Sequence, residues 1–324
     1  MLINLRNALM TGKRLPYDAE VEFLQSSGTQ YIDTGIKPGP NTRVEAVFAM
    51  TTFTANCGLF GARGNAAADD NSYNLFIISN SGARVRWDWS GTGNYQTSQA
   101  ETSTAATYVL GSAGGNITRD GVTVMAVSAS KAAINYPLYV FNMNNVGSPY
   151  STGANARFWS VKIYDGQTLV FDYIPVRKGT VGYLYDRVSG KLFGNAGTGD
   201  FVCGQDVVPA TWVDGEYWNT FGVATALSGA SRCDNYIPVQ PSSSVTFYVG
   251  IRPGGTVLRM IQYNGDKARI DSTAANNGSA RTVTIPANCY YIRVSVETAK
   301  KNEAYIHDNT NDRDLLRNGK VLVG

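Results

Sequence analysis

Histidine, the side chain that most often carries acid–base chemistry near neutral pH, occurs once in the 324 residues, at His307. It stands beside Asp308 in a polar stretch near the end of the chain. A single histidine in that setting is more often a solvated surface residue than a catalytic base. No serine lies in a G-x-S-x-G motif, the turn that presents the nucleophile of many hydrolases. These patterns give no support for nucleophilic catalysis.

Carboxylates offer two further kinds of chemistry, glycoside hydrolysis and metal binding. A glycosidase needs a pair of acids, and no strand-like stretch carries them in a Glu-x-Asp-x-x-Glu pattern. Asp69, Asp70 and Asn71 lie in a polar stretch typical of a loop. Their oxygens suit Ca²⁺, but such runs are usually solvated. We therefore predict a protein that is not an enzyme, with no catalytic residue, no metal and no cofactor.

Aromatic side chains are better candidates for binding, because sugar rings stack on Trp and Tyr while polar groups satisfy the hydroxyls. Trp87 and Trp89 lie two apart in a strand-like run, so both point to one face and Arg86 to the other. A glycan site in this region would use Trp87, Trp89 and Arg86. The alternative is that at least one of the indoles fills a core.

A second aromatic pair, Tyr217 and Trp218, precedes Asn219 in a stretch that looks loop-like. An exposed indole there is a further candidate for sugar binding. The remaining two tryptophans have structural interpretations. We expect Trp212 to pack near a domain junction, and Trp159, which alternates with apolar residues, to lie in a core.

Charge and hydropathy argue against two classes of partner. Lys and Arg number 28 against 25 Asp and Glu, a net charge of +3, and the basic pairs lie far apart. This pattern does not favour a nucleic-acid partner. No stretch approaches the ~20 apolar residues of a membrane span. Nor do the first residues form a secretory signal peptide, because polar side chains interrupt the apolar ones.

The four cysteines show no CxxC spacing and no histidine at metal-ligand distance in the sequence. Each lies in or beside a strand-like run, where a lone cysteine usually packs as a small apolar residue. We expect four free thiols. Cys233 and Cys289 fall in the same half of the chain, and whether they ever pair stays open.

Residues 1–18 differ in pattern from the rest of the chain. Leu2, Leu5 and Leu9 form one stripe at helical spacing. So short a helix is marginal alone, and the segment either packs on its own domain or docks on a partner. We predict that these three leucines serve attachment or assembly.

The remainder of the chain has the pattern of short strands separated by turns. Asp120-Gly121 and Asn264-Gly265 are hairpin signals, one in each half. Many short strands without intervening helices indicate sandwiches or jelly rolls. We divide the chain into an N-terminal attachment segment (1–18), a first β-domain (19–206), a linker (207–211), a small β-sandwich (212–312) and a C-terminal tail (313–324).

Three stretches of the first domain carry a family resemblance. They are residues 22–35 (EFLQSSGTQYIDTG), 158–165 with 172–179 (FWSVKIYD and DYIPVRKG), and 184–199 (LYDRVSGKLFGNAGTG). They resemble the opening and closing strands of LamG-like, concanavalin A-like jelly rolls of phage and gut-bacterial proteins. The resemblance covers residues 20–206 and implies that fold. One departure is Val176, where such domains often carry Cys.

The second domain resembles, more loosely, small sandwich modules appended to phage tail and surface proteins. The residues that carry this likeness are 236–239 (YIPV), 285–287 (IPA), 291–295 (YIRVS) and 297–306 (ETAKKNEAYI). The expected fold is therefore all-β. It consists of a concanavalin A/LamG-like jelly-roll sandwich, a second smaller β-sandwich and a short N-terminal helical or extended segment.

Chains with this combination are usually virion appendage or decoration proteins. The resemblance implies a bacteriophage virion structural protein, a tail or capsid fibre or decoration subunit, made in the host cytoplasm without a signal peptide. Its implied partners are other virion proteins, sister chains in a homo-oligomer and host-surface glycans, with no nucleic acid and no membrane. The alternative is a carbohydrate-binding adhesin or module of a gut bacterium, including a prophage-encoded one.

Overall fold

The computed structural model describes residues 15–323, with gaps at 53, 55, 65–71, 78–83, 90–94, 101–105, 111–116, 126–132, 311–312 and 318. In β7 (Arg84–Trp89) and β8 (Tyr95–Ala100) it describes the backbone. Two groups of predicted residues lie outside the described part: the leucines Leu2, Leu5 and Leu9, and the loop residues Asp69, Asp70 and Asn71. The roles that the sequence predicts for them stay predictions.

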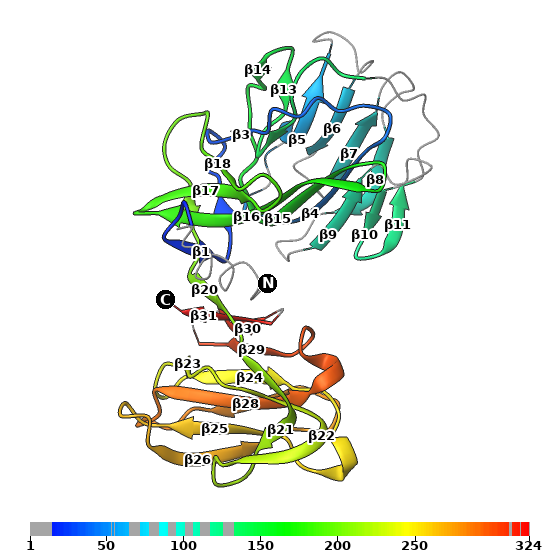
Figure 1. Ribbon diagram of the computed structural model, residues 1–324. Helices are drawn as coiled ribbons and strands as arrows, with labels where there is room; N and C mark the ends of the chain where they lie inside the picture. The colour runs from blue at the N-terminus through cyan, green and yellow to red at the C-terminus, as the bar shows by residue number, and fades with distance from the viewer. Residues whose placement is uncertain are drawn as a thin grey trace. The chain divides into compact units, whose positions relative to one another are not determined.

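The chain folds as two compact units, Leu15–Gly204 and a C-terminal unit that begins at Gln205 (Figure 1). Both consist of strands, and the described residues include only two short 3-10 turns, η1 (Pro253–Gly255) and η2 (Thr298–Lys300). The prediction of an all-β sandwich protein is confirmed.

The prediction that residues 207–211 form a linker and residues 313–324 a separate tail is wrong, because both segments belong to the C-terminal unit. Residues 206–209 form β20 (Asp206–Pro209), which pairs with β31 (Lys320–Val323) at the end of the chain. The tail also supplies core side chains, because Leu315, Leu316 and Val321 are at most 1% exposed. A solvated tail would have exposed these apolar residues, so their burial draws the last strands into the C-terminal unit.

One sheet of the N-terminal unit is a long antiparallel series. In order of pairing it runs β11 (Val122–Met125), β10 (Ile117–Arg119), β9 (Ala106–Leu110), β4 (Thr42–Met50), β15 (Ala156–Asp165), β16 (Thr168–Lys178), β17 (Val181–Asp186) and β18 (Lys191–Phe193). Short strands extend it: β1 (Ala19–Val21) on β16, β2 (Leu24–Gln25) on β15, and β19 (Val202–Cys203) on β2. The predicted Asp120-Gly121 hairpin is confirmed, since Arg119 pairs with Val122 across it.

The second sheet of this unit contains the strand with the predicted tryptophans. Its order is β8, β7, β6 (Ser72–Ile77), β5 (Cys57–Arg63), β13 (Asn144–Asn145) and β14 (Ser148–Pro149). Here β13 runs parallel to β5, and β12 (Tyr139–Val140) bridges β5 and β3 (Ile32–Asp33). The apolar side chains of both sheets form one core. In it Phe48 stacks on Tyr108 and Phe158, with ring centroids 4.5 and 5.4 Å apart.

Trp159 lies outside this core, contrary to the sequence prediction. The pairing of β15 with β4 shifts between Phe158 and Ser160, which marks a β-bulge. An extra residue at a bulge changes which face the following side chains occupy. Phe158 and Val161 are therefore both buried, while Trp159 is half-buried and packs edge-on against Phe23 at 5.6 Å.

Two stretches that carry the family resemblance are packed against each other. The backbone N–H of Thr198 donates to the carbonyl of Thr29 (3.2 Å), and that of Tyr31 donates to Oδ1 of Asn195 (3.1 Å). Between them, a Cβ added to Gly197 would lie 2.1 Å from the Thr29 carbonyl oxygen. Glycine is therefore required by this close approach rather than by a turn.

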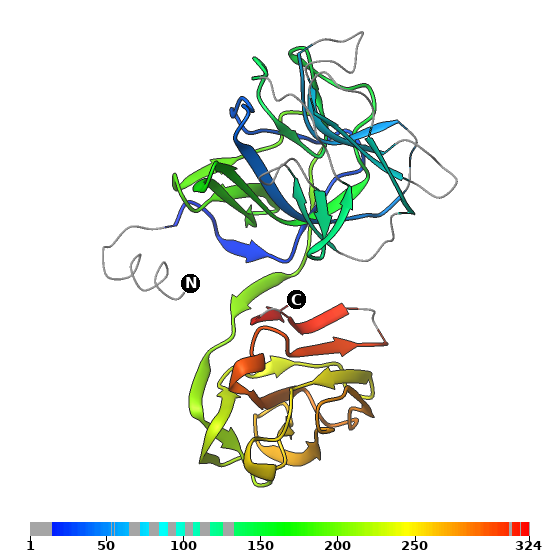
Figure 2. The ribbon, with the colours of Figure 1, turned by 90° about the vertical axis from the view of Figure 1, so that its right-hand side faces the viewer.

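The C-terminal unit is a sandwich of two sheets, which Figure 2 shows from the side. The first has the order β20, β31, β30 (Arg313–Arg317), β29 (Tyr305–Asp308), β24 (Ser244–Tyr248) and β27 (Arg281–Thr284). The second has the order β21 (Trp212–Trp218), β22 (Ala224–Cys233), β28 (Tyr291–Glu297), β25 (Arg259–Tyr263) and β26 (Arg269–Ala274), with β23 (Ile237–Pro238) also on β28.

The alternation along β28 decides which face of this second sheet is the core. Ile292, Val294 and Val296 are fully buried in the core of the unit. Because side chains alternate along a strand, Arg293 and Ser295 lie on the opposite face. Trp212, expected near a domain junction, packs against the core of this same unit.

Candidate functional site

The face of the second sheet opposite the core carries a group of aromatic and basic side chains, here called the aromatic–cation face. Its members come from four elements of the sheet and from the loops that join them. They are Trp218, Tyr236, Tyr263, Tyr291, Arg232, Lys267 and Arg293.

Trp218 lies at the centre of this face and is only 5% exposed. Its indole Nε1 donates to the carbonyl of Cys233 (3.0 Å), and its backbone N–H donates to Oγ of Ser295 (2.7 Å). The expectation that Trp218 is exposed in a loop is wrong, because it is the last residue of β21 and faces the sheet. Its indole offers no open face on which a sugar could stack.

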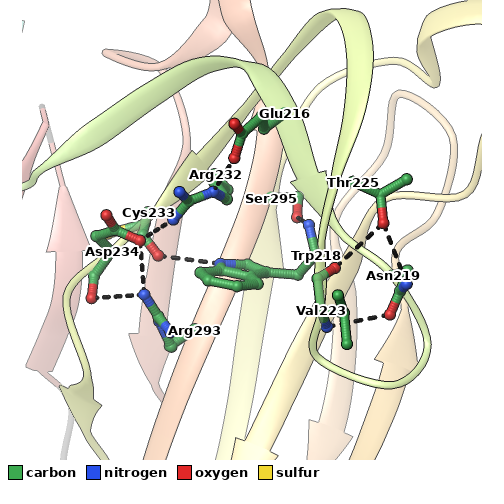
Figure 3. Close-up of polar contacts among 10 residues, drawn as sticks. All are labelled: Glu216, Trp218, Asn219, Val223, Thr225, Arg232, Cys233, Asp234, Arg293 and Ser295. Atoms are coloured by element: carbon green, nitrogen blue, oxygen red, sulfur yellow. Dashed lines mark hydrogen bonds and ion pairs between the residues drawn. The ribbon is translucent and has the colours of Figure 1, made fainter.

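Two guanidinium groups cover the indole. Cζ of Arg293 lies 3.8 Å from the ring centroid and Cζ of Arg232 lies 4.6 Å from it, and Figure 3 shows the ring between the two side chains. Such cation–π contacts contribute about 0.5–2 kcal/mol each, most where water is excluded. The two arginines therefore belong to the packing of Trp218.

Acidic side chains neutralise these arginines. The Asp234 carboxylate accepts from Nη1 of Arg232 and from Nη2 of Arg293, the latter at 2.7 Å. Glu216 accepts from Nε of Arg232 at 2.6 Å. The arginine side chains are only 14% and 12% exposed, and pairing offsets the cost of removing their charges from water. The interior of the face is thus a charge-balanced scaffold.

The rim of the face is more open. Tyr236 meets Tyr263 and Tyr291 edge-on, at 5.0 and 6.1 Å between centroids. Nζ of the exposed Lys267 lies 4.9 Å from the Tyr236 ring and 5.5 Å from the Tyr291 ring. Burial is the main cause that raises the pKa of Tyr263 above its ordinary value, so this hydroxyl keeps its proton at neutral pH. Tyr236 and Tyr291 are half-buried, which leaves part of each ring accessible.

The loop that presents Lys267 differs from the two-residue turn that Asn264-Gly265 predicts. It is closed by a hydrogen bond from the Asn264 N–H to the carbonyl of Ala268 (2.9 Å), and Lys267 has a φ of 60°. Oδ1 of Asn264 also accepts from the N–H groups of Asp266 and Ala268 (3.0 and 2.9 Å). A non-glycine residue in this left-handed backbone conformation costs about 1–2 kcal/mol, and the hydrogen bonds of the loop offset that cost.

A neighbouring loop, residues 219–223, holds an exposed aromatic side chain that the sequence patterns above did not single out. Phe221 is 74% exposed and Val223 is 58% exposed. Oδ1 of Asn219 accepts from the backbone N–H groups of both residues (2.9 and 3.1 Å). A Cβ on Gly222 would lie 3.2 Å from the Tyr263 hydroxyl and 3.3 Å from Cδ of Arg269. The loop therefore lies directly beside the rim. The Asn219-Thr220-Phe221-Gly222 sequence is a turn pattern that could have placed Phe221 at a tip.

The other predicted sugar-binding residues do not join this face. Tyr217 is half-buried and packs against the core of the C-terminal unit, on the opposite side of β21 from Trp218. In the N-terminal unit, Trp87 and Trp89 pair through their backbones with Leu75 and Tyr73, and Arg86 pairs with Phe76. The side chains of Trp87, Trp89 and Arg86 are not among those described, so a sugar site there stays a prediction.

The remaining chemical candidates have structural contacts. Nδ1 of His307 lies 3.0 Å from Oδ1 of Asp314 across the β29–β30 pair. All four cysteines are free thiols, so Cys233 and Cys289 are not bonded in this structure. Within the described ranges, no group of three or more His, Cys, Asp or Glu is placed to hold a metal ion. The helical turns in the same ranges are too short to span a bilayer.

Comparisons with known proteins add little to this geometry. No protein-family model matches the sequence, and no curated protein matches it. Among solved structures, the chain is similar to a mutant of the NanB sialidase from Streptococcus pneumoniae. The identity is 10% and the TM-score 0.30, over 94% of this chain and 67% of that one. A similarity at this level carries no conclusion about fold or activity.

Proposed function

We propose that this protein is a non-enzymatic bacteriophage virion subunit, a fibre or decoration protein of tail or capsid, that binds host-surface glycans through its C-terminal unit. The observation that carries the binding role is the rim of the aromatic–cation face. There, partly accessible rings of Tyr236 and Tyr291 lie beside the exposed Lys267. Flat apolar surfaces next to hydrogen-bond donors are what sugar rings require.

The arrangement of the rim supports binding by a preformed surface. Asn219 fixes the loop that carries Phe221, and Asn264 fixes the loop that carries Lys267. A ligand therefore need not order these loops, which lowers the entropic cost of association. Weak recognition of a sugar depends on such low costs, because each stacking contact contributes little.

The virion role rests on the resemblance of residues 20–206 to LamG-like jelly rolls of phage proteins. The packing of Gly197 against Thr29 gives a structural reason for two of its motifs to occur together. Under this proposal Leu2, Leu5 and Leu9 attach the chain to other virion proteins or to sister chains in a homo-oligomer. A glycan-binding adhesin of a gut bacterium would use the same C-terminal face. The two functions therefore differ in whether the protein is carried by a virion or by a bacterium.

Two measurements test the proposal. Mass spectrometry and immunogold labelling of purified particles should detect the protein on tail or capsid. A fluorescent form of the full chain should label host cells, and Phe221→Ala should weaken this labelling several-fold. Val188→Ala is the matched control, since Val188 is 52% exposed in the other unit. Absence from particles would leave only the adhesin function. Unchanged labelling by Phe221→Ala would contradict the assigned face.

A further inference from the structure

The charges on the aromatic–cation face do not balance at its rim. The two carboxylates beside the buried indole already form ion pairs. Glu216 pairs with Arg232, and Asp234 pairs with both Arg232 and Arg293. Lys267 lies on the exposed loop beside the tyrosines and has no ion pair among the residues that the structure describes. The rim therefore carries positive charge that its own carboxylates do not neutralise.

Arg269 adds a second unneutralised cation. It is exposed, lies opposite Tyr263 in the β25–β26 pair, and has no ion pair within the described part of the chain. The nearest acids in sequence are Asp266 and Asp271, and within the described ranges neither carboxylate forms an ion pair with Lys267 or Arg269. Oδ1 of Asp271 accepts from the backbone N–H of Ser272 (2.7 Å).

The two cations flank aromatic surface on both sides. Cδ of Arg269 would lie 3.3 Å from a Cβ on Gly222, next to the 74% exposed Phe221. Nζ of Lys267 lies 4.9 Å from the centroid of the Tyr236 ring, within cation–π range. A ligand that spans this rim meets rings that suit an apolar sugar face and cations that suit an anionic substituent. A charged hydrogen bond to a carboxylate is about twice as strong as a neutral one.

We propose that the rim selects acidic glycans, in which carboxylate groups on the sugar are bound by Lys267 and Arg269 while the ring stacks on the neighbouring aromatic side chains. This inference rests on the proposed glycan-binding function and narrows its ligand class. It differs from a general basic patch, because these two cations lie beside aromatic rings and the net charge of the chain is only +3.

The test uses pairs of probes that differ only in charge. Oligogalacturonate and its full methyl ester share the same rings and linkages, as do sialyllactose and its methyl ester. Isothermal calorimetry or a glycan array with the full chain should show at least one carboxylate probe bound about 10-fold or more tightly than its neutral partner. The double variant Lys267→Gln with Arg269→Gln should lose about 10- to 100-fold of that affinity.

Two controls keep the result interpretable. The double variant Lys37→Gln with Lys191→Gln removes two exposed positive charges from the N-terminal unit and should leave binding unchanged. Circular dichroism melting should show that the Lys267→Gln, Arg269→Gln protein is folded. If both double variants lose affinity for the carboxylate probes equally, the attraction is nonspecific and the inference is wrong.

Other outcomes separate the inference from the proposed function. If neutral sugars bind as tightly as acidic ones and Phe221→Ala still weakens binding, the glycan-binding function stands and the acidic preference is wrong. If no probe binds at all, the acidic preference falls together with the assigned glycan face. Detection on virions would then support the structural part of the proposed function alone.

Discussion

Replacement of Trp218 by alanine should destabilise the C-terminal unit by about 3–5 kcal/mol, the usual range for a large aromatic core residue. The indole is 5% exposed, so nearly all of its apolar surface would be lost from the packing. The change also removes the donor to the Cys233 carbonyl and leaves Arg232 and Arg293 without the ring that separates them. A conservative Trp218→Phe change keeps a ring but loses the N–H donor, and should cost about 1–3 kcal/mol.

Hydrogen exchange measured by mass spectrometry at increasing urea concentration reports this effect in each unit of the full chain. Peptides from Gln205 onward should lose protection at lower urea in Trp218→Ala, while those of Leu15–Gly204 should not change. Trp159→Ala is the matched control: its half-buried ring should cost less, and only in the N-terminal unit. If Trp218→Ala changes stability by less than about 1 kcal/mol yet abolishes glycan binding, the burial argument is refuted and Trp218 is a binding platform.

Single contacts elsewhere in the chain give three more predictions. Gly197→Ala should destabilise the N-terminal unit by about 1–3 kcal/mol or more, because its Cβ would meet the Thr29 carbonyl at 2.1 Å. Gly39→Ala, with nothing within 4 Å, should be neutral in the same urea titration. Hydrogen bonds from Lys301 and Ser231 lower the pKa of Asp214. The contribution of this carboxylate to the free energy of unfolding is therefore present above its pKa in the unfolded chain, and it is lost as pH falls through its pKa in the folded protein. Asp214→Asn should thus be less stable than the parent at pH 7 by under about 1 kcal/mol and equal to it near pH 2 in melting curves, whereas a constant difference would contradict the pairing. Burial raises the pKa of Cys57 and Cys233 to about 11 and also raises that of Cys289, so a thiol reagent at pH 8 should label one site, Cys203, quickly and all four only in urea. Labelling of Cys57 and Cys203 alone in urea would show that Cys233 and Cys289 pair.

The strand periodicity of the sequence predicted the fold class, but the phase of each strand depended on single residues. In β15 a bulge between Phe158 and Ser160 moved Trp159 out of the core. In β21 the turn begins only at Asn219, so Trp218 is still a strand residue and its side chain packs on the aromatic–cation face. Periodicity locates strands, but a shift of one residue exchanges their faces, and the contacts that fix this shift lie on other strands.

The composition of the candidate site could not be predicted for a related reason. Trp218 and Arg293 stand 75 residues apart in the sequence and meet because β21 and β28 both flank β22. No local pattern specifies that order. The exposed position of Phe221 could have been predicted, since an Asn and a Gly three residues apart, Asn219 and Gly222, mark a turn.

The two layers of the aromatic–cation face separate stability from recognition. Arg293 and Trp218 lie under the surface, and the charge of the arginine is used by Asp234. A change there disturbs the scaffold that holds the rim, so a loss of binding would not identify a ligand contact. Lys267 and Arg269 are exposed and have no ion pair among the described residues, so removing their charge should cost little folding energy. Binding that falls in rim variants at unchanged stability, and falls in interior variants only together with stability, would therefore place the ligand at the rim.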